Sequence, residues 1–339
     1  MPKQNSRKRV TINDIAQMTG TSKTTVSFYI NGKTDHMSEE TRLVIQEAIR
    51  KTGYEPSPLA RGMNSKQSNL LGVVIGDITN TFSNQIVKGI TSVADEHGYR
   101  VLVSSSNFRK TDELAYIDRL IAVGVDGFIV QPTAQFKKIM TYIENAGRQT
   151  VFIDSKFYGY ESNWVKTDNY EASHRAISAC IEKGYERFLL VTAEPGLLSS
   201  RIERFSGFVD ALEPTELGFT QLELHDDKVP VEQLQEFLRS NIDGVTPTLV
   251  FAPNCWALPD IYVAMREFYP LMPDRVGLLG FDNTDWASVA SPSVSVVVQP
   301  AQQEGAQACK ILLDLIAHAG KIDPHQVLSC RTQWGTSTL

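Results

Sequence analysis

The chain is poor in cysteine and histidine, and neither residue type occurs in a pattern that binds metal or performs catalysis. Cys180, Cys255, Cys309 and Cys330 are too far apart for a zinc ribbon or a dithiol motif. The six histidines show no metal-ligand spacing, and the sequence lacks a nucleophile elbow and an HExxH motif. We therefore expect no metal, no cofactor and no catalytic residue, and we expect the cysteines to be reduced thiols that pack in the core.

Long hydrophobic runs are absent too. No apolar run reaches the roughly 18 residues that indicate a transmembrane helix, and the N-terminal MPKQNSRKRV has no apolar stretch like that of a signal peptide. The 339 residues, of which 42% are hydrophobic and 21% charged, have the composition of a globular chain with two or three domains. These features predict a cytoplasmic protein that is neither secreted nor inserted in a membrane.

The chain carries no strong overall charge, but its charge is unevenly distributed. The formal net charge is −6, which by itself favours neither nucleic acid nor a membrane as a partner. Residues 1–66 contain 11 lysines and arginines but 6 acidic residues, so this segment has a net charge of +5 and the remainder −11. A basic segment ahead of an acidic body indicates that one end of the chain contacts phosphates. A solvated basic tail is the alternative on charge alone.

Three short helices are predicted in the basic segment, each with a capping residue. Thr11 begins the first helix, as the hydroxyl of a capping box, and Gly20 ends it. Ser22 begins the second helix, Lys23–Ile30, and Ser38 begins the third. We expect the third helix to bury an apolar side made of four residues: Leu43, Ile45, Ala48 and Ile49.

The tight turn between the first two helices is typical of a helix-turn-helix, which places the second helix in the major groove of DNA. Lys23, Thr24 and Ser27 are expected to face outward from that helix, and they are small, polar or basic, as a surface in a groove requires. A neutral three-helix interaction module is the alternative interpretation.

Residues 10–75 resemble the start of the lactose-repressor (LacI/GalR) family of transcriptional regulators. The resemblance lies in VTINDIAQMTGTSKTTVSFYINGK and in MSEETRLVIQEAIRKTGYEPSPLARGMNSKQSNLLGVVI, and it continues more sparsely to the C-terminus. It implies an all-α helix-turn-helix DNA-binding domain in residues 1–55 and a linker with a hinge helix in residues 56–68. Residues 69–339 would then form an α/β, two-lobed, periplasmic-binding-protein-like domain that binds an effector and dimerises.

The resemblance also assigns DNA contacts to individual residues. Lys23 and Thr24 would read base edges from the start of the recognition helix. Six further polar residues would position phosphates: Thr11, Ser22, Thr25, Ser27, Asn31 and Thr41. Phe28 departs from the family, which usually has an arginine there that can hold a guanine. Phenylalanine can instead pack on a thymine methyl or on its own domain.

The linker begins at Pro56 and Pro58, because the residue before each proline is driven into extended geometry. Residues 59–66 could form two helical turns, but a segment this short should be helical only when something holds it. The resemblance implies a hinge helix in the minor groove, with Met63 as the apolar wedge between base steps and Lys66 near the DNA backbone. A plain flexible linker is the alternative.

From residue 70 to the strand predicted at Val276–Phe281, short apolar strands alternate with helices, which predicts parallel sheets with helices on both faces. So long a stretch exceeds one comfortable sheet, so we expect two lobes. We assign residues 69–167 and 300–324 to the N-lobe, and residues 168–299 and 325–339 to the C-lobe.

Ligands of such folds bind beyond the carboxyl ends of the strands, and polar residues follow several predicted strands. These residues are Asp77, Gln131, Asp154, Asn254 and Asp282. Carboxylates and amides gathered at strand ends suit the hydroxyl groups of a sugar. Each of them could instead be a helix cap or a loop acid.

The resemblance extends the candidate effector site. Arg204 matches the family's effector-holding arginine, and Ser200 and Gln299 fall on further contact positions, whereas Arg201 could be a surface charge. Lys166 falls where the family tends to have an apolar residue that faces the cleft. If Lys166 were unpaired, it would favour an anionic effector such as a sugar acid or sugar phosphate. The alternative is that Lys166 pairs with Asp154 or Asp168, or faces water.

The predicted function is that of a sequence-specific transcriptional regulator, a repressor of carbohydrate-utilisation genes, which a small sugar-type effector controls. The family resemblance implies a homodimer on a palindromic operator. A solute-binding receptor and an enzyme acting on a sugar are the alternatives. The basic helical head disfavours the receptor, and the missing catalytic motifs disfavour the enzyme.

Overall fold

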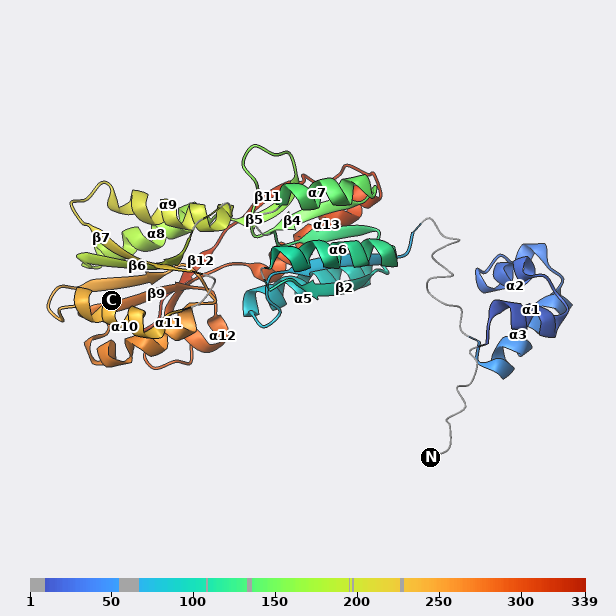
Figure 1. Cartoon of the computed structure of the whole chain (residues 1–339), viewed down its shortest axis with the longest axis horizontal. Coiled ribbons are helices and arrows are strands. Elements are labelled where there is room, and N and C mark those ends of the chain that lie inside the picture. Colours follow the sequence, from blue (N-terminus) through green and yellow to red (C-terminus); the bar gives the residue numbers. More distant parts are fainter. Residues whose placement is uncertain are drawn as a thin grey trace, which may run out of the picture. The chain divides into compact units, whose positions relative to one another are not determined.

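The computed structural model describes residues 10–54, 67–107, 109–132, 136–194, 196, 198–225 and 229–339. The chain forms two compact units, which divide between Ser68 and Asn69 (Figure 1). Within the described residues, no helix is long and apolar enough to span a membrane.

The N-terminal unit consists of three helices and a short 3₁₀ turn: α1 (Ile12–Thr19), α2 (Lys23–Ile30), η1 (Thr34–His36) and α3 (Glu39–Thr52). The predicted caps are confirmed. Thr11 and Asp14 form the capping box of α1, Gly20 ends α1 in the left-handed conformation, and the hydroxyl of Ser22 accepts a hydrogen bond from the N–H of Thr25. Ser38 caps α3 in the same way.

A small core joins the three helices, and it contains Ile15, Val26, Ile45 and Ala48. The expectation that Leu43 lies on the buried side of α3 is wrong, because this side chain is 55% exposed. Successive residues of an α-helix are about 100° apart, so Leu43 lies about 200° from Ile45, on the far side of the helix.

The larger unit contains two lobes, and each is a sheet covered by helices on both faces. The six strands of the first sheet are all parallel and run in the order β11-β5-β4-β3-β1-β2. Its strands are β1 (Leu70–Ile75), β2 (Arg100–Ser105), β3 (Gly127–Val130), β4 (Gln149–Ile153), β5 (Asn163–Thr167) and β11 (His325–Leu328). Its helices are α5 (Thr81–Glu96), α6 (Lys110–Val123), α7 (Phe136–Asn145) and α13 (Ala301–Ile316).

The second sheet has the order β12-β10-β9-β8-β6-β7, with only β12 antiparallel to its neighbour. Its strands are β6 (Arg187–Ala193), β7 (Phe219–Leu224), β8 (Thr248–Ala252), β9 (Val276–Phe281), β10 (Ser295–Val298) and β12 (Arg331–Gln333). Its helices are α8 (Asn169–Glu182), α9 (Ser199–Leu212), α10 (Val231–Asn241), α11 (Leu258–Ala264), the 3₁₀ helix η2 (Met265–Leu271) and α12 (Thr284–Ala287). Figure 1 shows α8 and α9 on one side of this sheet and α10 and α11 on the other.

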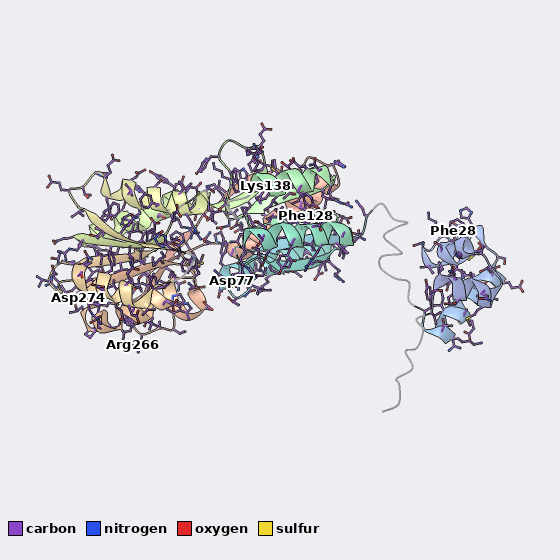
Figure 2. The ribbon with its side chains drawn as sticks, in the orientation of Figure 1. Phe28, Asp77, Phe128, Lys138, Arg266 and Asp274 are labelled. Atoms are coloured by element: carbon purple, nitrogen blue, oxygen red, sulfur yellow. The ribbon has the colours of Figure 1, made fainter. Side chains whose placement is uncertain are left out.

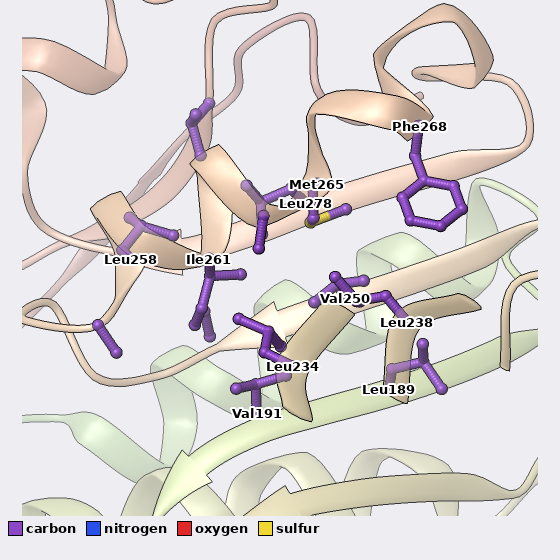
Figure 3. Close-up of a cluster of buried hydrophobic side chains, with 14 of the residues drawn as sticks. Leu189, Val191, Leu234, Leu238, Val250, Leu258, Ile261, Met265, Phe268 and Leu278 are labelled. Carbon is purple, nitrogen blue, oxygen red and sulfur yellow. The ribbon is translucent and has the colours of Figure 1, made fainter. Parts of the chain in front are cut away.

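Buried strands supply hydrophobic side chains to both faces of each sheet, since successive residues of a strand point in opposite directions. In β8, Val250 packs against the layer of α10 and α11, whereas Phe251 packs against the layer of α8 and α9. Figure 3 shows Val250 among Leu234 and Leu238 of α10 and Ile261 of α11. These packed layers hold the strand ends in fixed positions.

Two glycines allow α5 and α13 to pack closely against each other. A Cβ on Gly89 would lie 1.9 Å from the carbonyl oxygen of Gln302, and one on Gly305 would lie 2.1 Å from that of Ile86. Any side chain at either position would therefore force the two helices apart.

Three crossovers connect the lobes and run side by side: β5 to α8, β10 to α13, and β11 to β12. The N–H of Asp168, in the first crossover, donates to the carbonyl of Leu328 over 3.0 Å. The carboxylate of Asp168 accepts from the N–H of Cys330 over 2.6 Å. The side-chain amide of Gln299 donates to the hydroxyl of Thr167 over 2.9 Å, which joins the remaining crossover.

Residues 325–339 do not all lie in the C-lobe, so this part of the lobe assignment is wrong. Strand β11 pairs with β5 over His325–Leu328 and therefore belongs to the first sheet. Only β12 pairs with β10 of the second sheet. The chain crosses between the lobes after Leu328, because β11 completes the free edge of β5, a strand that the sequence analysis did not predict.

Candidate functional site

One candidate site is a hollow on the N-terminal unit, formed along α2 and the turn that follows it. It brings together five of the predicted DNA contacts and two residues that were not predicted, Ile12 and Lys33. The five are Lys23, Thr24, Ser27, Phe28 and Asn31. Lys23 and Thr24 are exposed to solvent in the first turn of α2. The positive end of the helix dipole lies there and favours a phosphate group.

Phe28 lies in this hollow, half-buried, with its ring 5.6 Å from the ring of His36. It is labelled on the N-terminal unit in Figure 2. The ring contact with η1 fixes one side of Phe28, and the other side lines the hollow. Phe28 thus offers an apolar surface among lysines and small polar groups.

The other predicted phosphate contacts lie outside the hollow: Thr11 and Ser22 are helix caps, and Thr25 and Thr41 are bonded by caps. The hydroxyls of Ser22 and Thr25 lie 2.9 Å apart, and the hydroxyl of Thr41 lies 2.9 Å from that of Ser38. The hydroxyl of Thr11 donates to Asp14 over 2.7 Å. Met63 and Lys66, assigned to the minor groove and the DNA backbone, lie outside the described residues.

The second candidate site lies between the lobes, at the carboxyl ends of both sheets. A cavity there is lined by six of the predicted effector contacts: Gln131, Asp154, Ser200, Arg204, Asn254 and Gln299. Its volume is about 50 Å³, well below the roughly 300 Å³ at which ligand pockets begin. The lobes or the lining side chains must therefore move to admit a molecule as large as a sugar.

Arg204, on α9, is buried at the centre of this site and is fixed by hydrogen bonds from all three of its nitrogens. Nε donates to Asn169 Oδ1, Nη1 to the carbonyl of Pro253 and Nη2 to Gln299 Oε1, each over 2.7 Å. The guanidinium also lies over the ring of Phe281, 4.1 Å from its centroid. Arg204 is thus a preorganised cation from the C-lobe.

Asp154 faces Arg204 from the N-lobe, 4.0 Å from Nη2. The Gln131 side-chain amide donates to the Asp154 carboxylate over 3.3 Å, and the Asp154 N–H donates to Glu304 over 2.6 Å. Asp154 has a φ of 69°, a left-handed conformation that is unusual outside glycine, and the bond to Glu304 stabilises it. The two lobes therefore present opposite charges to each other across the cavity.

Asn254 and Asp282 support the cavity from the second sheet. Asn254 Oδ1 accepts from the N–H of Ala193 over 2.8 Å, and Asp282 accepts from the N–H of Gln299 over 2.9 Å. Asp282 does not line the cavity, but its second carboxylate oxygen is buried without a partner in the described structure.

Three carboxyl groups near Arg204, those of Asp154, Asp282 and Glu304, have raised pKa values. Burial raises the pKa of Asp282 to about 7 and that of Glu304 well above its usual value. Burial also raises the pKa of Asp154, and the neighbouring Arg204 opposes this increase. Near neutral pH, these acids hold protons more readily than surface carboxyls do.

Asp77 does not join the others. Figure 2 shows it at the end of the first lobe that faces the second. Its carboxylate accepts from the N–H and hydroxyl of Thr79, each over 2.8 Å, and it does not line the cavity. Asp77 thus has the turn-forming contacts that were weighed as the alternative.

Lys166 is neither unpaired nor bonded to the partners that the sequence suggested. Its Nζ lies 2.7 Å from a carboxylate oxygen of Glu203, and both side chains are buried. The hydroxyl of Tyr158 donates to the other oxygen of Glu203 over 2.9 Å. Because Glu203 neutralises Lys166, this lysine does not call for an anionic effector, and the expectation that rested on an unpaired Lys166 is wrong.

Sequence reasoning missed several residues of the cleft. Asn80, Phe82, Leu198, Cys255 and Trp256 also line the cavity, and so does Arg201, which the sequence allowed to be a surface charge. Burial raises the pKa of the Cys255 thiol to about 11, so it is not a reactive thiolate. Asn169, which accepts a hydrogen bond from Arg204, lies two residues after β5 and could have been found by the strand-end rule, had that strand been predicted.

A helix-turn-helix unit followed by two lobes that enclose a polar cleft is the domain arrangement of a class of DNA-binding transcriptional regulators. Residues 11–57 match the model described as "Bacterial regulatory proteins, lacI family". Residues 68–255 match "Periplasmic binding proteins and sugar binding domain of LacI family", and residues 177–338 match "Periplasmic binding protein-like domain".

The relatives agree with these matches. The chain is 31% identical to the HTH-type transcriptional regulator KdgR of Bacillus subtilis, over 93% of each chain. It is 27% identical to the ribose operon repressor of the same organism, over 90% of this chain and 91% of the relative. A Lac repressor dimer, solved bound to operator and the anti-inducer ONPF, has the same fold, with a TM-score of 0.78 and 23% identity over 98% of this chain and 100% of that one. The chain belongs to the LacI family of transcriptional regulators.

Proposed function

We propose that this LacI-family regulator is a homodimeric repressor of carbohydrate-utilisation genes, which binds a palindromic operator and acts in the cytoplasm. Its affinity for the operator would depend on a small hydroxyl-rich effector held between the lobes. The observation that carries this proposal is the opposition of Arg204 and Asp154 across the cleft, with Gln131 and Gln299 beside them.

The donor and acceptor arrangement of the cleft suits a carbohydrate. Arg204, Gln131 and Asn254 offer nitrogen donors, and the carboxyl of Asp154 accepts, so a vicinal diol could bond both lobes at once. Trp256, which also lines the cavity, adds an aromatic surface for the apolar face of a sugar ring. An effector held in this way would change the angle between the lobes.

An anionic effector, such as a sugar acid or a sugar phosphate, is the second candidate. Lys166 does not support it, because Glu203 neutralises this lysine. Arg201 and Arg204 do support it, since they lie one turn apart on α9 and both line the cavity. Calorimetry with a sugar acid and with the matching neutral sugar separates the two candidates: tight binding of the neutral sugar alone would exclude the anionic one.

The proposed mechanism couples the cleft to the DNA through the first lobe. Effector binding favours one arrangement of the lobes. In a dimer, this arrangement sets the distance between the two linkers, each of which leads into β1 of its own copy. The recognition helices, α2 of each copy, then fit or miss the spacing of the two half-sites. The direction of control follows from which lobe arrangement fits the operator.

DNA binding is tested by selecting palindromic duplexes and measuring mobility shifts. Lys23→Ala should change the preferred bases, whereas Lys66→Ala should weaken all sequences alike. Lys51→Ala is a matched control, because Lys51 lies at the end of α3 and pairs with Glu47 away from the hollow. A wild-type protein without preference among duplexes would contradict the proposal.

A further inference from the structure

A second pocket lies in the first lobe, at the start of β4 and β5. Its volume is about 380 Å³, within the range of small-molecule sites. Met140 and Phe152 supply apolar lining, and Arg148, Thr150 and Ser162 supply polar groups. Because β1, β4 and β5 are parallel, this is the end of the sheet at which the chain enters β1, opposite the cleft.

The pocket has buried polar atoms that no other group satisfies. Within the described residues, eight buried side-chain nitrogen and oxygen atoms have no hydrogen-bond partner. Three of them, Nε of Arg148, Oγ1 of Thr150 and Oγ of Ser162, belong to residues that line this one pocket. Burying a polar atom without a hydrogen-bond partner costs free energy. Three such atoms in one pocket therefore indicate that a bound molecule supplies the missing hydrogen bonds.

The cleft between the lobes also contains buried polar atoms without hydrogen-bond partners. Asp282, Glu304 and Trp256 also have unpartnered buried atoms, and all three lie in or directly behind the candidate effector site. In the described chain, unpartnered polar atoms therefore gather at two places, and the pocket at the start of β4 is the second.

The chemistry of the pocket is that of an anion site. Arg148 Nε–H and the hydroxyls of Thr150 and Ser162 can all donate, and the guanidinium carries a fixed positive charge. Glu144 and Glu161 lie at the exposed rim, and no acid of the described structure is paired with Arg148. Rim carboxylates can turn toward water, where their charge is screened.

The neighbouring residues hold the donors in place. Thr150 is 7% exposed and lies in β4 between β3 and β5. The Ser162 carbonyl lies 3.0 Å from His325 Nε2, and the His325 ring stacks on Trp164 at 5.3 Å. Arg148 follows the end of α7, with its backbone N–H bonded to Ile143. All three donor atoms are buried, so the side chains that line the pocket must shift for a ligand to reach them, and Arg148 and Ser162 are only half-buried.

We propose that this pocket binds a small oxyanion-bearing metabolite, with a phosphate or carboxylate group at Arg148, Thr150 and Ser162 and a short carbon skeleton on Met140 and Phe152. The site is separate from the effector cleft. Strand β4 of five residues separates the two by about 16 Å at 3.3 Å per residue. The full chain would thus have two ligand-binding sites, one at each end of the first sheet.

The test is thermal unfolding of the full chain at constant ionic strength. Inorganic phosphate, glycerol 3-phosphate and succinate are compared with chloride, so that phosphate and carboxylate ligands are distinguished. An anion that binds the folded state raises the melting temperature in a concentration-dependent way. The proposal predicts such a rise with at least one of the three anions.

Variants locate the binding. Arg148→Gln should abolish the rise, whereas Arg119→Gln, an exposed arginine on α6 outside the pocket, should keep it. Arg204→Ala should keep it as well, which separates this site from the cleft. Thr150→Val removes one hydroxyl without changing the shape, so it should fold normally and bind at least tenfold more weakly. An equal rise in wild type and both pocket variants, or no rise above chloride, would overturn the proposal.

Discussion

Lys166 of β5 and Glu203 of α9 form an ion pair between the two lobes, 2.7 Å long and buried on both sides. The pair lies beside the first crossover and joins the N-lobe to the helix that carries Arg204. Breaking it leaves one charge without a partner in a poorly solvated place, whereas removing both charges does not.

Lys166→Met and Glu203→Met should each lower the free energy of unfolding by about 3–5 kcal/mol. The double variant should recover most of this loss, because neither charge then remains. Urea denaturation of the three variants gives the coupling energy through a double-mutant cycle. Additive losses would mean that the two side chains do not depend on each other.

Asp282→Asn should change the pH dependence of stability. Burial raises the pKa of Asp282 to about 7 in the folded protein, from an ordinary value of 3.8. Between these values the folded state holds the extra proton, so stability falls as pH rises toward 7, by up to about 1.4 kcal/mol per unit. The asparagine variant should lose this part of the slope and be more stable than wild type above pH 7.

Gly89→Ala should destabilise the larger unit by about 3 kcal/mol, since the new Cβ would lie 1.9 Å from the carbonyl oxygen of Gln302. Gly218→Ala is the matched control, because no atom lies within 4 Å of a Cβ built there. The control should stay within about 0.5 kcal/mol of wild type in urea denaturation. Similar stabilities for both variants would contradict the close packing of α5 on α13.

Phe28 should make the protein sensitive to the C5-methyl groups of thymine. Replacing single operator thymines with uracil should weaken the wild type at one position per half-site and leave Phe28→Ala unaffected. Phe28→Arg should gain a preference for guanine at that position, of about 1–3 kcal/mol. Anisotropy titrations measure both effects, and a wild type indifferent to uracil throughout would mean that Phe28 only packs on His36.

The local features of the fold could be predicted because they depend on neighbours in sequence. Thr11 and Ser22 begin helices and Gly20 ends one, through hydrogen bonds to residues three or four positions away. Their residue types are therefore enough to predict these helix ends. Leu43 could not be placed correctly, because a three-helix core is narrow and covers only the side of α3 that carries Ile45 and Ala48. Periodicity indicates a face but not its width.

The candidate cleft was predicted in part, because some of its residues can be found from their position next to a strand. Gln131 and Asp154 directly follow apolar strands, Asn254 lies two residues after one, and the carboxyl ends of parallel strands lie at the same edge of a sheet. Strand β5 was missed because Asn163 and Lys166 interrupt its apolar pattern, and this hid Asn169. The partners of Lys166 and Asp154 are Glu203 and Glu304, 37 and 150 residues away, so only the tertiary fold brings them together.

Measuring operator affinity with and without a cleft-binding sugar shows whether the cleft controls DNA binding. We expect a saturating sugar to change the affinity of the wild type for the operator at least fivefold, equivalent to about 1 kcal/mol of coupling. Arg204→Ala should bind the operator nearly as well as wild type but show no response. A sugar that binds the cleft without changing operator affinity, or an unchanged response in Arg204→Ala, would contradict the proposal that the cleft controls DNA binding.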